Sequence, residues 1–373
     1  MGLAVAYHLA ERGQKDVLVV ERSYLCAGAS GRNGGGVRAH WSSEKNVRIM
    51  QESLERISHF SRRFGIHVWF RRGGYLFLAR SETKAEALAQ SVAVQRGCGM
   101  ATELVSAAEA TRIVPELDTT GVRAASWSPD DAVVFPWPFV WGYAQAAQKL
   151  GVEVRTHTEV VSLDREAGRV VGAVLRDATT GEESRVRCDT LVCAAGAWSK
   201  QLATMAGVDL PTHPHRHEIC SSEPLKPWLG PLVADLETGL YFSQSTRGEI
   251  VGGLGNEFVP AGFDQGSSYS FLARYARALT QTCPRLAPVR ILRQWAGFYD
   301  LTEDANPIVG FTDEAPGMYF LAGFMGHGFM MAPAVGDKAA AEILSGDTPE
   351  EFKTWNLQRF RDGNLLTESM IIG

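Results

Sequence analysis

The sequence contains no long hydrophobic stretch, no run of lysine and arginine, and no C-x-x-C pair of cysteines. No apolar run approaches the roughly 20 residues of a membrane-spanning helix, and no signal peptide is recognisable. The net charge of -5 argues against a nucleic-acid-binding protein. Repeats and low-complexity segments are absent as well. What remains is a globular chain of 373 residues, 45% of them hydrophobic, with enough core for two domains or one large domain.

The six cysteines are scattered over the chain, and none forms a C-x-x-C pair. The spacing therefore indicates neither a zinc site nor a redox dithiol. Scattered cysteines are typical of reduced thiols in a cytoplasmic protein, and we expect that location, with peripheral contact to the inner membrane left open.

The first 36 residues carry the pattern that organises the chain. Residues 1–13 are predicted to form a helix that ends at Gly13, residues 17–20 a buried strand closed by Glu21, and residues 23–36 a glycine-rich loop. Helix, strand and acid form the second half of a dinucleotide-binding unit. In such a unit Glu21 bonds the ribose hydroxyls and the helix N-terminus faces the pyrophosphate.

The preceding strand and the first glycines of that unit are missing, and Gly2 fits the last glycine of the fingerprint. We expect a truncated start, because the helix has no cap and its sheet would lack a central strand. The alternative is a unit that binds no nucleotide.

Hydrophobic periodicity divides the rest of the chain. Helices are expected over residues 41–64 (capped by Ser42 or Ser43), 81–97, 106–115, 139–150, 269–280 and 334–344. Strands are expected over 68–79 with a break at Gly73 and Gly74, in a meander of 152–156, 160–165, 170–177 and 184–188, and over 211–222, 240–245, 249–253, 291–299, 307–310 and 319–322. Residues 190–199 combine an apolar strand with a small-residue turn, where backbone can approach a ligand closely.

Four ordered motifs resemble a known family. They are Glu21 with the loop 28–34, the turn 194–199, the runs 295–302 and 306–310, and the glycine cluster 323–333. Together they resemble the FAD-dependent amino-acid and amine oxidoreductases related to D-amino-acid oxidase, glycine oxidase and sarcosine oxidase. Within that group the chain looks most like the β subunits of dye-linked L-proline dehydrogenase and sarcosine oxidase.

The resemblance implies an α/β and α+β protein with two domains. A Rossmann-like FAD-binding domain would be discontinuous, built from residues 1–65, 136–212 and 300–373. A mixed-sheet substrate-binding domain would contain residues 66–135 and 213–299.

The resemblance also implies the site residues. Arg38, Tyr241, Tyr299 and His327 would face the substrate. The residues expected along FAD are Gly2, Glu21, Arg22, Ser30, Arg32, Asn33, Gly34, Val160, Ala195, Gly196, Ala197, Trp198, Gly326, His327, Gly328, Phe329 and Met330.

Positions where the sequence departs from the family pattern lead to predictions about flavin attachment, the electron acceptor and the carboxylate contact. Gly297 and Asp130 (or Pro129) stand where relatives attach flavin through cysteine or histidine, so we expect non-covalent FAD. Ile250 and Met330 match lysines that promote the reaction with oxygen, which favours a dehydrogenase. Tyr299 stands near the position of a carboxylate-binding arginine in glycine oxidase.

Several single residues have more than one possible role. Arg38 is a candidate carboxylate clamp, and a pyrophosphate contact or a surface arginine is the alternative. The alternating His213, His215 and His217 imitate a metal site, but no acidic or cysteine partner stands at ligand spacing, so we expect no metal. His327 is expected to contact flavin rather than to act as a base.

The predicted function is FAD-dependent dehydrogenation, or oxidative deamination, of a small amino acid or secondary amine of the proline, sarcosine or glycine type. Hydride would pass to flavin N5, without a dedicated catalytic base. An oxygen-using oxidase and a flavin-free structural subunit are the alternatives. A partner subunit or electron acceptor is expected, and neither nucleic acid nor a transmembrane segment.

Overall fold

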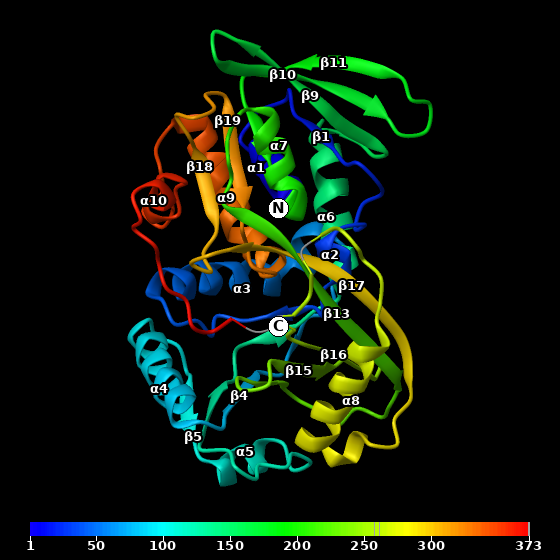
Figure 1. Ribbon diagram of the computed structural model, residues 1–373, viewed down its shortest axis with the longest axis vertical. Helices are drawn as coiled ribbons and strands as arrows, with labels where there is room; N and C mark the ends of the chain where they lie inside the picture. Colours follow the sequence, from blue (N-terminus) through cyan, green and yellow to red (C-terminus); the bar gives the residue numbers. More distant parts are fainter. Residues whose placement is uncertain (257, 261, 372–373) are drawn as a thin grey trace.

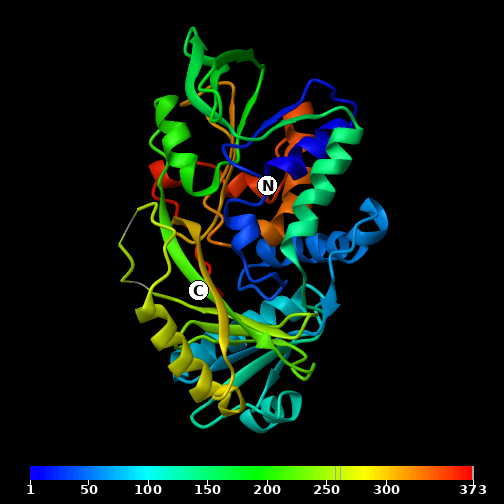
Figure 2. The ribbon, with the colours of Figure 1, turned by 90° about the vertical axis from the view of Figure 1, so that its right-hand side faces the viewer.

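The computed structural model describes residues 1–256, 258–260 and 262–371. In Figure 1 an upper half contains small sheets among helices, and a lower half is built on one large sheet. Helix α3 (Glu44–Phe64) crosses the molecule between them. Figure 2 shows the long strands β13 (Thr212–Pro224) and β17 (Ile291–Thr302) running from one half into the other.

The upper half contains the elements predicted to bind a nucleotide. Strand β1 (Leu18–Val20) pairs in parallel with β8 (Glu153–Arg155), and β12 (Leu191–Cys193) with β19 (Met318–Ala322), which pairs antiparallel with β18 (Ile308–Phe311). Helices α1 (Gly2–Glu11), α6 (Pro136–Lys149) and α9 (Gly328–Ser345) share one buried core with α3. The predicted order of helix, short strand and Glu21 is confirmed. The following segment is more than a loop, since α2 (Ala29–Arg32) forms within it.

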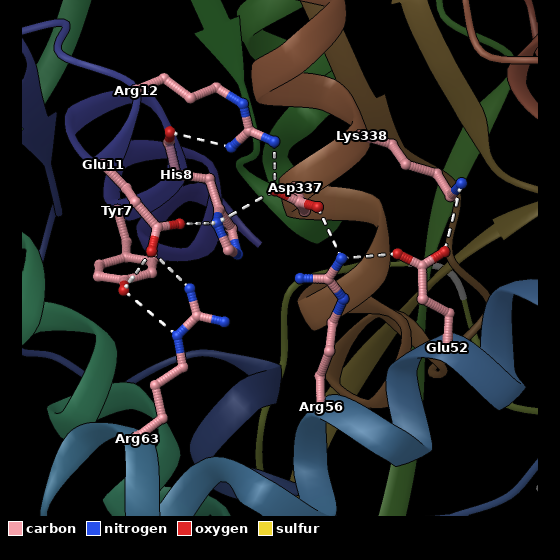
Figure 3. A network of polar contacts seen from close by, with 9 residues as sticks. All are labelled: Tyr7, His8, Glu11, Arg12, Glu52, Arg56, Arg63, Asp337 and Lys338. Atoms are coloured by element: carbon pink, nitrogen blue, oxygen red, sulfur yellow. Dashed lines mark hydrogen bonds and ion pairs between the residues drawn. The ribbon is translucent and has the colours of Figure 1, made fainter.

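Ion pairs tie α1, α3 and α9 together on one side of this core (Figure 3). Asp337 of α9 accepts from Arg12 and from Arg56, each at 2.6 Å. Arg63 of α3 pairs with Glu11 at the end of α1 at 2.5 Å. The network therefore fixes α1 and α9 relative to each other.

Two helices begin earlier than predicted, and each contains a proline close to the predicted start. Helix α6 begins at Pro136 rather than at residue 139, because proline suits the first turn of a helix. Helix α9 begins at Gly328 rather than at residue 334, although Pro333 inside it donates no backbone hydrogen bond. Other helices match the predictions more closely: α3, α4 (Glu82–Gly97) and α5 (Ala107–Ile113) begin directly after the serines 43, 81 and 106, which cap them.

The predicted meander is partly wrong. Strand β8 leaves it to pair with β1, and only β9 (Thr158–Glu166), β10 (Arg169–Asp177) and β11 (Glu183–Arg187) form an antiparallel sheet. Periodicity along the chain cannot show which strand is the hydrogen-bonding neighbour.

The lower half is an eight-stranded sheet with the order β17-β13-β16-β15-β14-β4-β6-β5. The prediction missed β5 (Glu103–Val105), β6 (Ala124–Ser128) and β14 (Leu232–Asp235), which are short. Strands β4 (Tyr75–Ala79), β15 (Leu240–Gln244) and β16 (Glu249–Leu254) were expected. Helix α8 (Tyr269–Thr282) and α5 pack on one face and α4 on the other.

The predicted break at Gly73 and Gly74 is confirmed. Before it, β3 (Arg71–Arg72) belongs to a separate small sheet with β7 (Ala132–Val133) and β2 (Gly36–Val37). After it, β4 enters the large sheet.

The domain boundaries stay a prediction. Two of them, after residues 212 and 299, fall inside β13 and β17, which pair from Thr212–Thr302 to Ser222–Ile291. Within the described part of the chain, no helix combines the length and apolar character that crossing a membrane requires.

Candidate functional site

A cavity of about 1420 Å³ lies in the upper half, among the N-terminal ends of α1 and α9, the segment after β1 and the turn after β12. We call it the large groove. Many of the residues expected along FAD line it: Gly2, Glu21, Arg22, Ser30, Arg32, Asn33, Val160, Ala195, Gly196, Ala197, Trp198, Gly326, Gly328 and Phe329.

The segment that starts at Glu21 fits an adenosine ribose. Glu21 follows β1 directly, and its Oε1 accepts from the backbone N–H of Ser23 at 2.8 Å. Its second carboxylate oxygen remains for another donor. The first residue of α1, Gly2, lines the groove too, so the free N–H groups of that helix end are near the space a pyrophosphate needs.

Aromatic rings form part of the groove wall. The turn η1 (Gly196–Trp198) carries Trp198, over which the Arg22 guanidinium lies at 4.2 Å. Trp198 stacks on Phe263 at 5.4 Å and meets Phe298 edge-on at 5.6 Å. These contacts make Trp198 a rigid wall rather than a mobile surface side chain.

The short α2 segment is fastened to the large sheet. Arg32 donates to the carbonyls of Ala27 at 2.8 Å and Ala296 at 3.0 Å. Asn33 accepts from the N–H of Gly35 at 2.8 Å. Gly35 has φ +77°, and a Cβ there would overlap the carbonyl oxygen of Val134. Arg32 thus fastens α2 to β17 while it also lines the large groove.

A second cavity, of about 100 Å³, adjoins the groove, because Arg32, Asn33, Phe298, Gly326 and Phe329 line both. We call it the small cavity. It brings together the residues predicted to face the substrate, two more of the residues expected along FAD, and the position where relatives attach flavin: Arg38, Tyr241, Tyr299 and His327, then Gly34 and Met330, then Gly297. Gly297, which stands where some relatives attach flavin, therefore reaches this cavity, whereas Asp130 makes an exposed pair with Arg72 at 3.8 Å.

Arg38 is a buried cation, with only 1% of its surface exposed, so the surface-arginine alternative is wrong. Its Nη2 donates to the carbonyl of Met370 at 2.5 Å and lies 3.4 Å from Nε2 of His327, and its Nη1 donates to the carbonyl of His40. The guanidinium lies 4.2 Å from the Trp41 ring centre. Within the described residues it pairs with no carboxylate, so it is available to an anionic ligand.

The two histidines of the small cavity are neutral near pH 7. Burial lowers the pKa of His217 to about 3, and burial followed by the charge of Arg38 lowers the pKa of His327 well below its ordinary value. His217 bonds the Tyr241 hydroxyl at 2.9 Å and stacks on Tyr299 at 4.6 Å. Such low pKa values make both rings poor general bases.

The histidine alternation on β13 does not build a metal site. His217 is buried against the two tyrosines, whereas His213 is exposed. Among the described residues no group of three or more histidine, cysteine and acidic side chains is placed to hold an ion.

One predicted position is wrong. Ile250 is buried in the core beneath α8, on the face of the sheet that points away from the small cavity, and its neighbour Val251 lines the cavity instead. Side chains alternate along a strand, so an alignment one residue out of register exchanges the two faces. Met330 does line the cavity.

Sequence reasoning missed Tyr75, Ser243 and Asp300. Tyr75 and Ser243 line the small cavity from β4 and β15. Asp300 lines the large groove and accepts from the N–H of Gly323 at 2.6 Å; burial raises the pKa of its carboxyl to about 7. The signal for Asp300 was an acid within the mostly apolar second half of β17, Trp295–Thr302.

Known proteins are similar to this chain in sequence and fold. The family described as DAO, FAD dependent oxidoreductase, matches residues 1–342. Sarcosine oxidase subunit beta of Rhodobacter capsulatus is 30% identical, with 100% of this chain and 89% of that protein aligned. The crystal structure of L-proline dehydrogenase from P. horikoshii superimposes with a TM-score of 0.90 at 33% identity, over 97% of this chain and 96% of that one. Glycine oxidase from Geobacillus kaustophilus, at 23% identity, has the same fold with a TM-score of 0.84 over 96% and 95%.

Proposed function

Because this chain belongs to the DAO family of FAD-dependent oxidoreductases, we propose that it oxidises a small amino acid or secondary amine in the small cavity. The resemblance to this family that the sequence suggested is confirmed, as is a mixed α/β fold. The protein is a flavoenzyme, and its substrate type, proline, sarcosine or glycine, is our proposal. The observation that carries it is the buried Arg38, which pairs with no carboxylate of the described residues, in a cavity that adjoins the large groove.

The residues present fit FAD. Glu21 would hold the ribose, Gly2 and the end of α1 the pyrophosphate, and the glycines at 326 and 328 the flavin edge beside the small cavity. When bound, FAD accepts the hydride from the substrate's C–H bond. The glycine cluster suits this place because it lets backbone approach a flat ring.

Arg38 would bind the substrate carboxylate. The charged side chains that line the small cavity are Arg32 and Arg38, and no acid is among the described lining residues. A guanidinium in such a site favours a carboxylate through paired hydrogen bonds. The cavity's small volume limits the substrate to a short side chain or a small ring.

The positive charges of Arg32 and Arg38 also influence the protonation state of the substrate amine. An ammonium group would meet two cations and two neutral histidines, so the substrate amine is expected to bind without its extra proton. Its lone pair then assists departure of the hydride, and no protein base is needed.

The acceptor is proposed to be other than oxygen. Met330 gives the small cavity an apolar side chain where a lysine would help oxygen react, and no lysine is among the described residues that line this cavity. The naming of relatives as a beta subunit supports a partner subunit. The six cysteines, all described, are free thiols, which supports a cytoplasmic location.

Anaerobic mixing of the FAD-loaded protein with proline, sarcosine, glycine and D-amino acids tests the proposal. At least one should bleach the flavin absorbance, and Arg38→Gln should slow that bleaching while FAD stays bound. A protein that binds FAD and is reduced by none of these compounds would contradict the substrate class. A colourless protein after loading with FAD would instead favour a flavin-free structural subunit.

A further inference from the structure

Residues 366–371 lie against the beginning of α3 and against Arg38. The carbonyl of Met370 accepts from Nη2 of Arg38 at 2.5 Å. The Met370 side chain is buried with Tyr75, Phe77 and Leu88, on the large-sheet side of the site. This segment, far from Arg38 in the sequence, therefore provides one of the two backbone acceptors that hold the guanidinium.

Glu368 fixes the path of that segment. Its Oε1 accepts from the backbone N–H of Ser42 at 2.9 Å and from that of Met370 at 3.0 Å, and also from the Ser42 hydroxyl. Its Oε2 accepts from Asn46 at 2.8 Å, and the N–H of Ser369 donates to the Ser42 hydroxyl at 3.0 Å. Glu368 is 7% exposed. A single buried carboxylate thus joins the start of α3 to the residue that contacts Arg38.

We propose that Glu368 is a positioning residue of the substrate site, which aims Arg38 at the small cavity through the carbonyl of Met370. This inference rests on the proposed function, in which Arg38 binds the substrate carboxylate. With its plane set by the carbonyls of His40 and Met370, Arg38 keeps its remaining donors for the cavity. A site binds its ligand less tightly when a binding group is displaced by about 0.5 Å or more. The hydrogen bonds that hold Arg38 in place should therefore affect substrate affinity.

Glu368 could act on Arg38 through its hydrogen bonds or through its negative charge, and two substitutions distinguish these causes. Glu368 also carries a negative charge, but it forms no ion pair with Arg38 within the described chain. Glu368→Gln removes the charge and keeps the Oε1 acceptor for Ser42 and Met370. Its new amide stands where Oε2 accepted from Nδ2 of Asn46, so the Asn46 amide must turn over to present its Oδ1, which is buried without a partner among the described residues, as the acceptor. Glu368→Ala removes all of these hydrogen bonds.

The experiment compares acetate with its neutral isostere acetamide on the FAD-loaded protein, with the flavin absorbance as the signal. The ratio of the two affinities reports how well Arg38 faces the ligand, whereas a general loss of structure weakens both ligands and FAD together. Glu368→Ala should reduce the preference for acetate by about tenfold, the value of one charge-assisted hydrogen bond. Glu368→Gln should keep the preference, and FAD affinity should not change in either variant.

Glu342→Gln is the matched control, since Glu342 is another buried carboxylate, which is bonded to Tyr319 at 2.5 Å and lines neither cavity. It should keep the preference for acetate. If Glu368→Ala does not fold, Ser42→Ala, which removes the hydroxyl's hydrogen bonds to Glu368 and Ser369, should lower the preference instead. An unchanged preference in the folded variant overturns the inference.

Arg38→Gln distinguishes a failure of the positioning role of Glu368 from a failure of the carboxylate-binding role of Arg38. If it abolishes the preference for acetate while Glu368→Ala leaves it intact, the positioning role alone is wrong. If Arg38→Gln itself has no effect, the carboxylate role of Arg38 is wrong, and the inference is overturned with it.

Discussion

The hydroxyl of Ser53 in α3 donates to the carbonyl of Met330 in α9 at 2.6 Å. The same oxygen accepts from the N–H of Ala334 at 3.4 Å, so it stands between the two groups that would bond each other in an undisturbed helix. Pro333 interrupts α9 at this point. Ser53 thus lets a helix with an internal proline keep its first turns, and those turns carry Gly328 and Phe329 to the large groove.

Ser53→Ala should lower the free energy of unfolding by about 1–3 kcal/mol, because it leaves a buried carbonyl without a partner. It should also weaken FAD binding, since the N-terminal end of α9 loses a support. Urea unfolding and an FAD titration measure the two effects. Ser58→Ala in the same helix, where the hydroxyl is exposed, is the control and should change neither.

Glu21→Ala should weaken FAD binding by about 1.5–3 kcal/mol, the value of a hydrogen bond to a charged group. The fold should survive, because the hydrogen bond that this substitution removes within the protein is a local one, donated by the backbone of Ser23. Fluorescence quenching of added FAD gives the affinity, and Glu166→Ala, an exposed acid of β9, is the control. Equal affinities in the variant and the unmodified protein would show that Glu21 does not hold the ribose.

Flavin should be held without a covalent bond. Gly297 offers no nucleophile in the small cavity, and the Asp130 side chain is exposed and pairs with Arg72. Acid precipitation of the yellow protein should release all colour into the supernatant. Colour that stays in the pellet would rule this out.

Asp300 should make stability depend on pH. Burial raises the pKa of its carboxyl from 3.8 to about 7, so the folded protein holds a proton that the unfolded chain has lost between these values. Its contribution to stability is therefore fully present below about pH 4 and is lost as the pH rises to about 7. Asp300→Asn, which keeps an acceptor for Gly323, should remove this loss and be relatively more stable at pH 8 than at pH 4. Parallel urea curves for both proteins at the two pH values decide it.

Met330→Lys should speed reoxidation of the reduced flavoprotein by oxygen, because a cation in the small cavity stabilises developing superoxide. The desolvated lysine should have a lowered pKa, which limits the gain at high pH. Stopped-flow mixing with air-saturated buffer, and separately with a dye, measures both rates. Ile250→Lys, which buries the charge in the core beneath α8, should instead destabilise the protein. Fast reoxidation of the unmodified protein by oxygen would favour an oxidase.

Local signals in the sequence determined much of this protein. Serines at 43, 81 and 106 mark helix starts because their hydroxyls accept the first free N–H groups, and these contacts involve near neighbours in the chain. The apolar strand before Glu21 and the glycine cluster after Ala322 likewise depend on short-range pattern. Such patterns were enough to identify the family, and most of the residues expected along FAD do line the large groove.

Tertiary structure alone decided the rest, because the deciding contacts join residues far apart in the chain. The sequence around Pro333 does not predict that Ser53 donates to the carbonyl of Met330 and so supports α9. The sequence around Ile250 does not determine which face of β16 points to the small cavity. The pairing of β8 with β1 and the short strands β5, β6 and β14 depend on neighbours in the sheet rather than on propensity. Arg38 is the clearest case: the sequence left a carboxylate clamp, a pyrophosphate contact and a surface arginine open, and only the tertiary structure showed that it is buried beside Met370 as an internal cation.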